Sequence, residues 1–211
     1  MYLPAHFAQH DTAALHALMA AHPLATLVVP TPDGPTADLV PLHLHTADGA
    51  TPELRGHVAR ANPLWRHADG QAVLAVFHGP QAYVTPSWYP SKARHGKVVP
   101  TWNYTMVQAR GTLHAVADAP WLRELVGLLT TVHEAPRALP WAVEDAPDDY
   151  VQQMLRAIVG IRIPLSTLVG KWKVSQNRDE ADRAGVAAGL AADPGQAEMA
   201  HLVATGGTPP R

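Results

Sequence analysis

The sequence predicts a mainly β protein with helices, of the α+β class, built as a small barrel with helices over its ends and edges. Six or more short apolar runs end at turn residues, and several helical patterns carry clear caps. A Rossmann fold is excluded, because it requires a glycine-rich turn between a strand and a helix and the chain has none.

The first seventy residues predict a meander of strands between two helices. Asp11 or Thr12 caps a first helix, which ends at His22-Pro23. Strands are expected at residues 25–31, 37–45 and 53–59, separated by the turns "PDG" and "ADG". A short helix follows at residues 61–70, with Asn62 as its cap and Pro63 at its first position.

The rest of the chain continues this pattern. Strands at 72–79 and 82–88 are expected to form a hairpin across Gly79-Pro80, and a long strand at about 101–116 bends at Gly111. The later elements are expected to be helices at 118–135, 146–157 and 178–191, a strand at 158–169, and a segment 170–177 that continues this strand or forms a loop. Residues 1–190 are predicted to be one domain, and residues 191–211 a tail that is partly mobile.

The composition excludes several classes of protein. The formal net charge of −2 removes the general electrostatic argument for nucleic-acid binding. Since cysteine is absent, there is no disulfide framework, thiolate nucleophile or cysteine-ligated zinc site. No apolar stretch approaches the roughly 20 residues of a membrane span, and the N-terminus lacks a signal-peptide pattern, so a cytoplasmic protein is expected.

The aromatic–basic segment, residues 87–104 ("SWYPSKARHGKVVPTWNY"), concentrates large rings and positive charge. It holds four of the chain's eleven tryptophans and tyrosines and three cations, but no acid. Base stacking along a basic groove would use both features, and so would a flavin site. A hairpin connection that is packed down by its own aromatic residues is the alternative without a ligand.

Two further stretches carry candidate binding chemistry. In "GHVARANP" (56–63), Arg60 lies just before a helix start, where unpaired N–H groups and a bidentate guanidinium would suit a phosphate. In "GKWKVSQNR" (170–178), strand alternation puts Lys171, Lys173 and Ser175 on one face. A solvated arginine beside a capped helix, and an exposed amphipathic strand, are the plain structural interpretations.

The thirteen histidines do not form a recognisable metal motif. "HLH" (43–45) puts two histidines on one face of a strand without an acid close in sequence, and "HE" at 133–134 does not continue as a metalloprotease helix. The expectation is that no metal is bound. A serine hydrolase and a helix-turn-helix reader of DNA also find no support, and no residue stands out as catalytic.

Seven stretches together resemble a known family: "MYLPAHF", "GHVARANPLW", "GPQAYVTPSWYPSK", "HGKVVPTWNY", "VHE", "DAPDDYVQQMLRAIVGIRI" and "GKWKVSQNR". They occur in order up to about residue 190 and are similar to the PaiB family, which is described as FMN-binding negative transcriptional regulators. That resemblance implies a six-stranded Greek-key FMN-binding split barrel. It also implies a homodimer with FMN at the subunit interface.

The resemblance assigns expected roles around FMN. On the phosphate side it implies His57, Ala59, Arg60 and Asn62. For the flavin ring or the cleft above it, the resemblance implies Ser87, Trp88, Tyr89, Lys97, Thr101, Trp102 and Asn103. For closing the pocket it implies Lys171, Trp172 and Gln176. Relatives often place a serine or threonine beside the arginine, whereas this chain has alanine on both sides of Arg60.

The resemblance implies a transcriptional repressor, and three alternatives stay open. The first is a flavin-dependent oxidoreductase linked to NAD(P)H, because the cofactor itself supplies the chemistry. The second is direct DNA binding by Lys92, Arg94 and Lys97, which neither charge nor motif supports. The third is haem binding, as in some split barrels.

Overall fold

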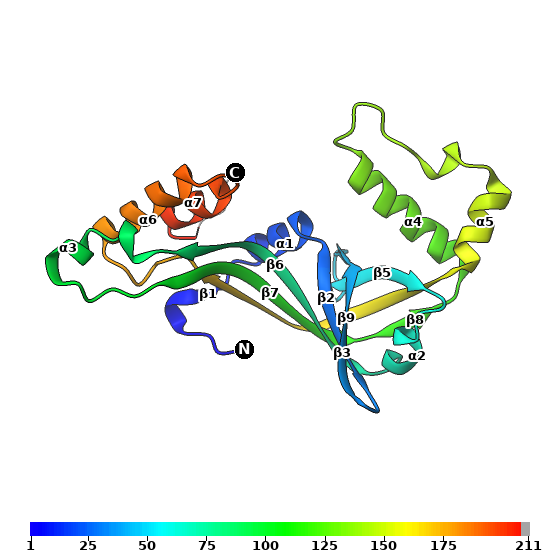
Figure 1. Cartoon of the computed structure of the whole chain (residues 1–211). Helices are drawn as coiled ribbons and strands as arrows, with labels where there is room; N and C mark the ends of the chain where they lie inside the picture. The colour runs from blue at the N-terminus through cyan, green and yellow to red at the C-terminus, as the bar shows by residue number, and fades with distance from the viewer. Residues whose placement is uncertain (208–211) are drawn as a thin grey trace. The chain divides into compact units, whose positions relative to one another are not determined.

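The computed structural model describes residues 1–207. The long strands are β2 (Leu24–Thr31), β3 (Gly34–Pro41), β5 (Glu53–Ala59), β6 (Ala72–Val84), β7 (Thr101–Thr112) and β9 (Ile158–Lys173). The short strands are β1 (Ala8–Gln9), β4 (His43–His45) and β8 (His114–Val116). They form one sheet in the order β3-β2-β6-β7-β9-β5-β4, with β1 and β8 each paired to β9 (Figure 1). Within residues 1–207 the sheet therefore has six long and three short strands, where the resemblance implies six strands.

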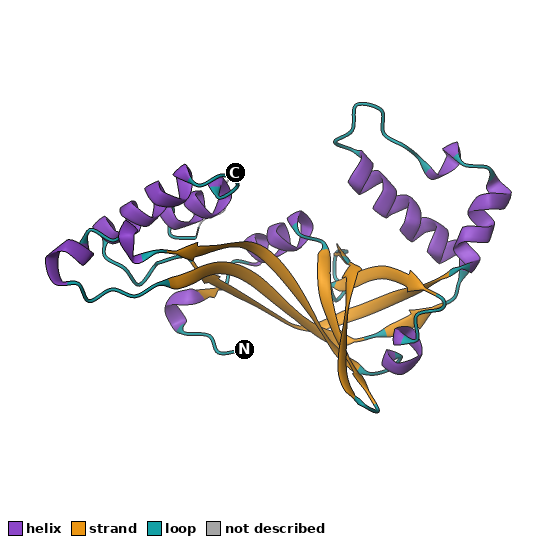
Figure 2. Ribbon diagram, in the orientation of Figure 1, coloured by secondary structure: helices purple, strands orange, loops and turns teal. Residues whose placement is uncertain are grey.

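Helices lie between the strands along the chain and follow the last strand (Figure 2). The α-helices are α1 (Thr12–Ala21), α2 (Leu64–Ala68), α3 (Ser91–His95), α4 (Ala119–Glu134), α5 (Asp148–Arg156), α6 (Glu180–Ala192) and α7 (Ala197–Ala204). Three short 3-10 helices cover Ala5–Phe7, Pro86–Trp88 and Val143–Asp145. No helix among residues 1–207 is both long enough and apolar enough to cross a lipid bilayer.

The chain divides into two compact units. Unit 1 consists of residues 1–22, 77–108 and 169–211, and unit 2 consists of residues 23–76 and 109–168. The long strands β6, β7 and β9 contribute residues to both units. The single-domain boundary at residue 190 stays a prediction.

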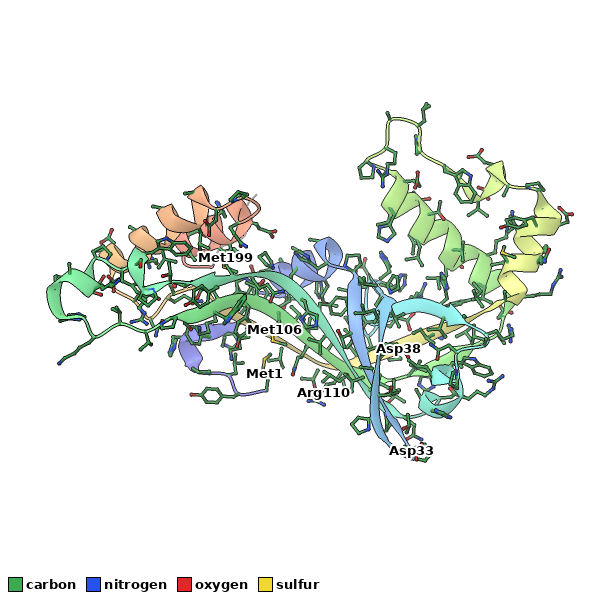
Figure 3. The ribbon with its side chains drawn as sticks, in the orientation of Figure 1. Met1, Asp33, Asp38, Met106, Arg110 and Met199 are labelled. Carbon is green, nitrogen blue, oxygen red and sulfur yellow. The ribbon has the colours of Figure 1, made fainter. Side chains whose placement is uncertain are left out.

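In unit 1, the helices bury apolar faces that the sequence pattern indicates. Helix α1 starts where the Asp11 carboxylate accepts a hydrogen bond from the Ala13 N–H at 3.0 Å, and it buries Leu18 and Met19. Helix α7 lies within the stretch expected to be a tail and buries Met199 among other residues (Figure 3). Residues 208–211 of the predicted tail lie outside the described residues.

In unit 2, α4 and α5 pack against each other around a small apolar cluster (Figure 1). The Asp118 carboxylate caps α4 by accepting from the Trp121 N–H at 2.8 Å. Leu122 of α4 and Leu155 of α5 are buried in the cluster together with Val143 and Val151. The apolar stripe predicted for α4 is thus partly buried, with Leu122 in this cluster.

The predicted hairpin across Gly79-Pro80 is wrong, because β6 runs without a break through both residues. Gly79 allows Thr105 and Leu18 to pack closely against the strand and does not form a turn. A Cβ at this position would lie 2.2 Å from the Thr105 hydroxyl oxygen and 2.8 Å from Leu18. The aromatic–basic segment likewise contains the short helix α3, which the sequence does not predict.

The single long strand predicted to about residue 116 is divided, because β7 passes through Gly111 and ends at Thr112, and β8 begins at His114. The break falls at Leu113, whose N–H donates to the Gln71 carbonyl at 3.0 Å and whose carbonyl accepts from the Gly70 N–H at 2.8 Å. These bonds take Leu113 out of the strand ladder. Gly111 is required for close approach, because a Cβ there would lie 2.2 Å from the Pro164 carbonyl oxygen.

Acid sensitivity is expected from Glu53, which joins β5 to β9. Its carboxylate accepts from Arg55 at 2.6 Å and from Arg162 at 2.7 and 3.0 Å. Burial alone would raise the pKa of Glu53, but the hydrogen bonds and charges of Arg162 and Arg55 hold it below its ordinary value of 4.5. A lowered folded-state pKa means that this stabilisation is complete above the unfolded-state pKa and disappears as the pH falls through the folded-state value.

Replacing Glu53 with glutamine should therefore lower the free energy of unfolding at pH 7 and flatten its decline below pH 4.5. Urea denaturation of both proteins between pH 7 and pH 3 measures this difference. A glutamine variant whose stability falls with acid as steeply as that of the unchanged protein would contradict the role of Glu53.

Candidate functional site

Unit 1 holds two lysines of β9 in surroundings that are poor in water. Lys171 is 8% exposed, and its ammonium group donates to the Tyr2 carbonyl at 3.1 Å. The same ammonium lies 5.7 Å from the Tyr2 ring centre and 5.3 Å from that of Tyr104, within the range of cation–π attraction. The contacts of this charge are therefore a carbonyl and two aromatic faces.

Lys173 follows on the same face of the strand and points to the start of β7. Its ammonium donates to the Thr101 hydroxyl at 2.5 Å and to the Trp102 carbonyl. Burial lowers the pKa of Lys173, and the positive charges of Lys171 and Arg178 lower it further. No acid within residues 1–207 forms an ion pair with Lys171 or Lys173. An uncompensated positive charge is costly in such a place, and an anionic ligand would offset that cost.

Polar groups beside the lysines are held in fixed orientations. The buried Asn103 amide donates to the Ser175 hydroxyl at 2.9 Å. Ser175 itself has a φ of 67°, a left-handed conformation that is uncommon for residues other than glycine. The Gln176 side chain closes this turn, because it donates to the Trp172 carbonyl at 2.6 Å and accepts from the Val174 N–H at 2.8 Å.

The predicted aromatic residues fall into packed and exposed groups. Trp172 is buried, while Trp102 is 56% exposed and makes an edge contact with Tyr83 at 5.9 Å. Tyr89 is buried beneath the Arg178 guanidinium, which lies 4.8 Å from the ring centre. Burial raises the pKa of Tyr89, and its hydroxyl forms no hydrogen bond of normal geometry with the described residues. The Tyr89 hydroxyl is therefore a buried polar atom beside the Arg178 guanidinium.

Trp88 packs against α6, and it does so at two glycines. A Cβ at Gly185 would lie 2.2 Å from the Trp88 carbonyl oxygen, and a Cβ at Gly189 would lie 2.3 Å from the Trp88 ring. The neighbouring Ser91 binds the same helix, because its N–H and hydroxyl donate to the Asp182 carboxylate at 3.0 and 2.6 Å. The evident role of Trp88 is to fix the aromatic–basic segment to α6.

Two predicted residues of this segment lie at the surface. Ser87 is exposed, and its N–H donates to the Thr85 hydroxyl at 3.3 Å. Lys97 is also exposed, and its N–H donates to the His95 ring at 3.0 Å. Their side chains have no contact with Lys171 or Lys173 among the hydrogen bonds of the described part of the chain.

The remaining predicted residues, His57, Ala59, Arg60 and Asn62, belong to unit 2. The Arg60 guanidinium donates to the Arg156 carbonyl at 2.6 Å and to the Ile158 carbonyl at 2.8 Å. The Asn62 amide oxygen accepts from the Leu64 N–H at 2.8 Å, as expected for a helix cap. Much of the hydrogen-bonding capacity at this corner is thus used within the protein, and Ala59 is exposed beside it.

His57 points into an apolar cavity of about 270 Å³ between β5 and the helices α4 and α5. Trp141, Tyr150 and Met154 lie at its exposed side. Burial lowers the pKa of His57, so the imidazole is neutral at pH 7. A neutral ring among apolar side chains suits contact with a flat ligand better than contact with a phosphate.

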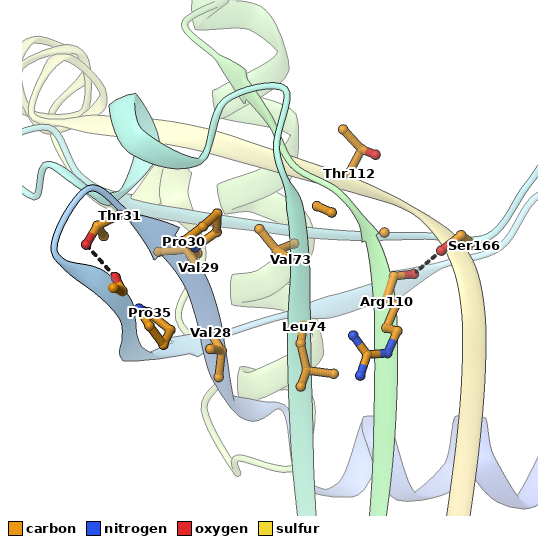
Figure 4. Close-up of a pocket in the computed structure, with 13 residues that line it drawn as sticks. Val28, Val29, Pro30, Thr31, Pro35, Val73, Leu74, Arg110, Thr112 and Ser166 are labelled. Carbon is orange, nitrogen blue, oxygen red and sulfur yellow. Dashed lines mark hydrogen bonds between the residues drawn. The ribbon is translucent and has the colours of Figure 1, made fainter. Parts of the chain in front are cut away.

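A larger cavity of about 520 Å³ lies elsewhere in unit 2 and contains none of the predicted site residues (Figure 4). Its walls come from the β2–β3 hairpin and from β6, β7 and β9, with Val28, Leu74 and Arg110 among them. The Ser166 hydroxyl donates to the Arg110 carbonyl at 3.2 Å at its edge. Apart from Arg110 the walls carry no charged side chain, so this hollow offers few groups that could fix a ligand.

Comparison with known structures defines the class of fold. The flavocytochrome Anf3 of Azotobacter vinelandii superposes with a TM-score of 0.55, at 16% identity, over 84% of this chain and 75% of that one. This similarity and the antiparallel sheet with its helices confirm the predicted α+β split-barrel fold.

The sequence comparisons define the family. Residues 1–167 match the family described as "Putative FMN-binding domain", so the chain belongs to that family and FMN is the cofactor that it names. An uncharacterized protein of Emericella nidulans is 33% identical over 90% of both chains. The Bacillus subtilis protein named "Protease synthase and sporulation protein PAI 2" is 29% identical over 96% of both chains. This relative confirms the resemblance to the PaiB family.

The residues of unit 1 fit FMN by their chemistry. The buried Lys171 and the half-buried Lys173 suit an anionic group, and Trp102 offers an accessible ring. These features match a ligand that combines a phosphate with a flat polar ring system.

Lys173 is a functional candidate that the predicted set of residues omits. The alternation of "KWKV" already places Lys173 on the same face as Lys171, but the resemblance implies only Lys171 as a site residue. The contact of Lys171 with Tyr2 had no comparable signal, because the two residues are 169 positions apart.

Proposed function

We propose that the chain is an FMN-binding flavoprotein and that it acts as a regulatory protein of the PaiB type. One observation carries the proposal of FMN binding. Lys171 is buried and Lys173, two residues along the same strand, is half-buried, and no acid of the described residues pairs with them. An anionic cofactor would stabilise both charges.

The chain's own residues divide the work of holding the cofactor. Lys171 and Lys173 would hold an anionic part of FMN, the Asn103–Ser175 pair keeps the strand ends in register, and Trp102 would supply a flat surface. The bound flavin supplies redox chemistry or a spectroscopic and structural signal. The proposal includes a cytoplasmic homodimer with FMN at the subunit interface, as the resemblance to PaiB implies.

The regulatory part of the proposal rests on the Bacillus subtilis relative, whose name refers to protease synthesis and sporulation. A second function, that of an NAD(P)H-linked flavin oxidoreductase, is favoured by a different observation. Of the three cations that could form a DNA-binding patch, Arg94 is paired with Asp179 at 3.0 Å, and the short helix α3 that carries it has five residues. The net charge of −2 points the same way.

The test of FMN binding is a titration of the purified apoprotein with FMN and with riboflavin, followed by flavin absorbance and fluorescence. We expect saturable binding of FMN and weaker binding of riboflavin, because riboflavin lacks the phosphate charge. Equal, unsaturable signals for both flavins would overturn the proposal.

An experiment on the FMN-loaded protein distinguishes the regulator from the oxidoreductase. Anaerobic addition of NADPH or NADH should leave a regulator yellow, whereas rapid bleaching near the flavin absorbance maximum would establish the oxidoreductase. Operator fragments from the protein's own promoter region, tested at several salt concentrations, provide the complementary measurement for a regulator.

A further inference from the structure

One face of the sheet in unit 2 carries a row of basic side chains across four strands. Arg55 of β5 lies directly opposite His43 of β4 on one side and Arg162 of β9 on the other. Arg162 in turn lies opposite His114 of β8. Residues that are directly opposite in an antiparallel pair share a face, with Cβ atoms about 4.5–5.5 Å apart. These four residues are called the basic row below.

A row of like charges needs compensation, because like charges directly opposite each other destabilise a sheet. Glu53 supplies it, since the carboxylate accepts from the Arg55 Nε at 2.6 Å and from the Arg162 Nη2 and Nε at 2.7 and 3.0 Å. The side chain of Glu53 is 6% exposed. One carboxylate thus serves two guanidinium groups, and one positive charge is left over.

Glu53 fixes the guanidinium groups of Arg55 and Arg162 in place but accepts hydrogen bonds from only some of their N–H groups. Both Nη atoms of Arg55 and the Nη1 atom of Arg162 have no hydrogen-bond partner within residues 1–207. The Arg162 side chain is 45% exposed and therefore borders on solvent, whereas the Arg55 side chain is 16% exposed. Preorganised arginine donors of this kind bind the oxygens of an anion with little loss of side-chain entropy.

His43 lies in the positive potential of the row. Burial lowers the pKa of His43, and the charges of His45, Arg55 and His133 lower it further. The described part of the chain brings no three histidine or acidic side chains together as a metal site. The surroundings of His43 therefore favour an anion over a cation.

We propose that the basic row binds a phosphate group. The three unused Nη groups come from two neighbouring strands, and a phosphate offers more oxygens to accept from them than a carboxylate does. The group belongs to FMN or to a second, phosphorylated ligand, and the experiment distinguishes these sources. The proposal does not depend on the lysines of unit 1.

The experiment is a titration of the apoprotein with inorganic phosphate, at constant ionic strength against chloride, followed by the NMR signals of the histidine rings. We expect saturable shifts for His43 and His114. Replacing Arg162 with glutamine should weaken phosphate binding by about tenfold or more, because a charge-assisted contact is lost. Replacing Arg162 with lysine should restore part of it, because the charge returns without the planar fork.

Arg137→Gln is the matched control, since it makes the same charge change at an exposed arginine of unit 2 and should leave phosphate affinity unchanged. Circular dichroism of each variant checks the fold. Equal phosphate affinity in the unchanged protein and in folded Arg162→Gln, or the absence of saturable shifts, would overturn the proposal.

A second titration, in FMN-loaded protein, assigns the source of the phosphate. If FMN prevents phosphate binding, the row holds the phosphate of FMN, and if phosphate still binds, the row serves a second ligand. Flavin absorbance reports FMN binding separately. If the protein binds phosphate at the basic row but does not bind FMN, the proposed function is refuted and the proposal of a phosphate site stands.

Discussion

Replacing Lys173 with methionine is expected to weaken FMN binding by roughly 10-fold to 150-fold. Methionine keeps the length and the apolar stem of the side chain but removes its charge. A hydrogen bond with a charged partner contributes about 1.5–3 kcal/mol, which corresponds to this range of affinities. The effect should be large because Lys173 is half-buried and has no acid partner within residues 1–207.

Fluorescence titration with FMN measures the loss, and Lys92→Met is the matched control. Lys92 is an exposed cation of unit 1 whose ammonium reaches the Ser87 hydroxyl at 3.5 Å. Its replacement makes the same charge change without touching Lys173. A parallel titration with riboflavin locates the contact, because a defect seen with FMN alone points to the phosphate and a defect with both ligands points to the ring. FMN affinity that is unchanged in Lys173→Met would remove this lysine from the site.

Replacing Gly111 with alanine is expected to destabilise the protein by about 1–3 kcal/mol, as overpacking of a closed interior typically does. The new Cβ would lie 2.2 Å from the Pro164 carbonyl oxygen and 2.7 Å from the Ile163 side chain. Since the first of these atoms belongs to the backbone of β9, the strain cannot be relieved by a rotamer change.

Gly127→Ala is the control, because nothing lies within 4 Å of a Cβ at that position of α4. This variant should be more stable than the unchanged protein by up to about 1 kcal/mol, as alanine favours helix over glycine. Urea unfolding midpoints of the three proteins measure both effects. A Gly111→Ala variant as stable as the unchanged protein would show that β7 and β9 do not approach each other so closely.

The sequence predicts those elements best whose local pattern and tertiary role agree. The strand at 53–59 has the predicted limits, and the capped helix at 118–135 differs by one residue at each end. The predicted hairpin at Gly79-Pro80 fails because both residues are typical of turns. Here Gly79 is needed for contact with Thr105, which comes much later in the chain. A local pattern cannot distinguish a glycine for turning from a glycine for packing.

The candidate site shows the same limit. Strand alternation identifies the lysine face of β9, but the burial of Lys171 depends on Tyr2 and Tyr104, which come from other elements. Arg60 appears free in the sequence, whereas its guanidinium binds carbonyls near residue 157. Whether a charged side chain is available to a ligand is decided by such long-range partners, and one sequence does not contain them.

The packing of Trp88 against Gly185 and Gly189 predicts how shortened forms of the chain behave. The family match ends at residue 167, yet the two glycines that contact Trp88 belong to α6, which follows that region. A truncated protein that keeps the matched region alone would leave Trp88 without these two glycines and Ser91 without the Asp182 carboxylate. Its tryptophan emission should shift to longer wavelength, and proteases should cut between residues 87 and 104. Helix α6 thus holds residues 87–104 in place, although it lies outside the region matched by the family.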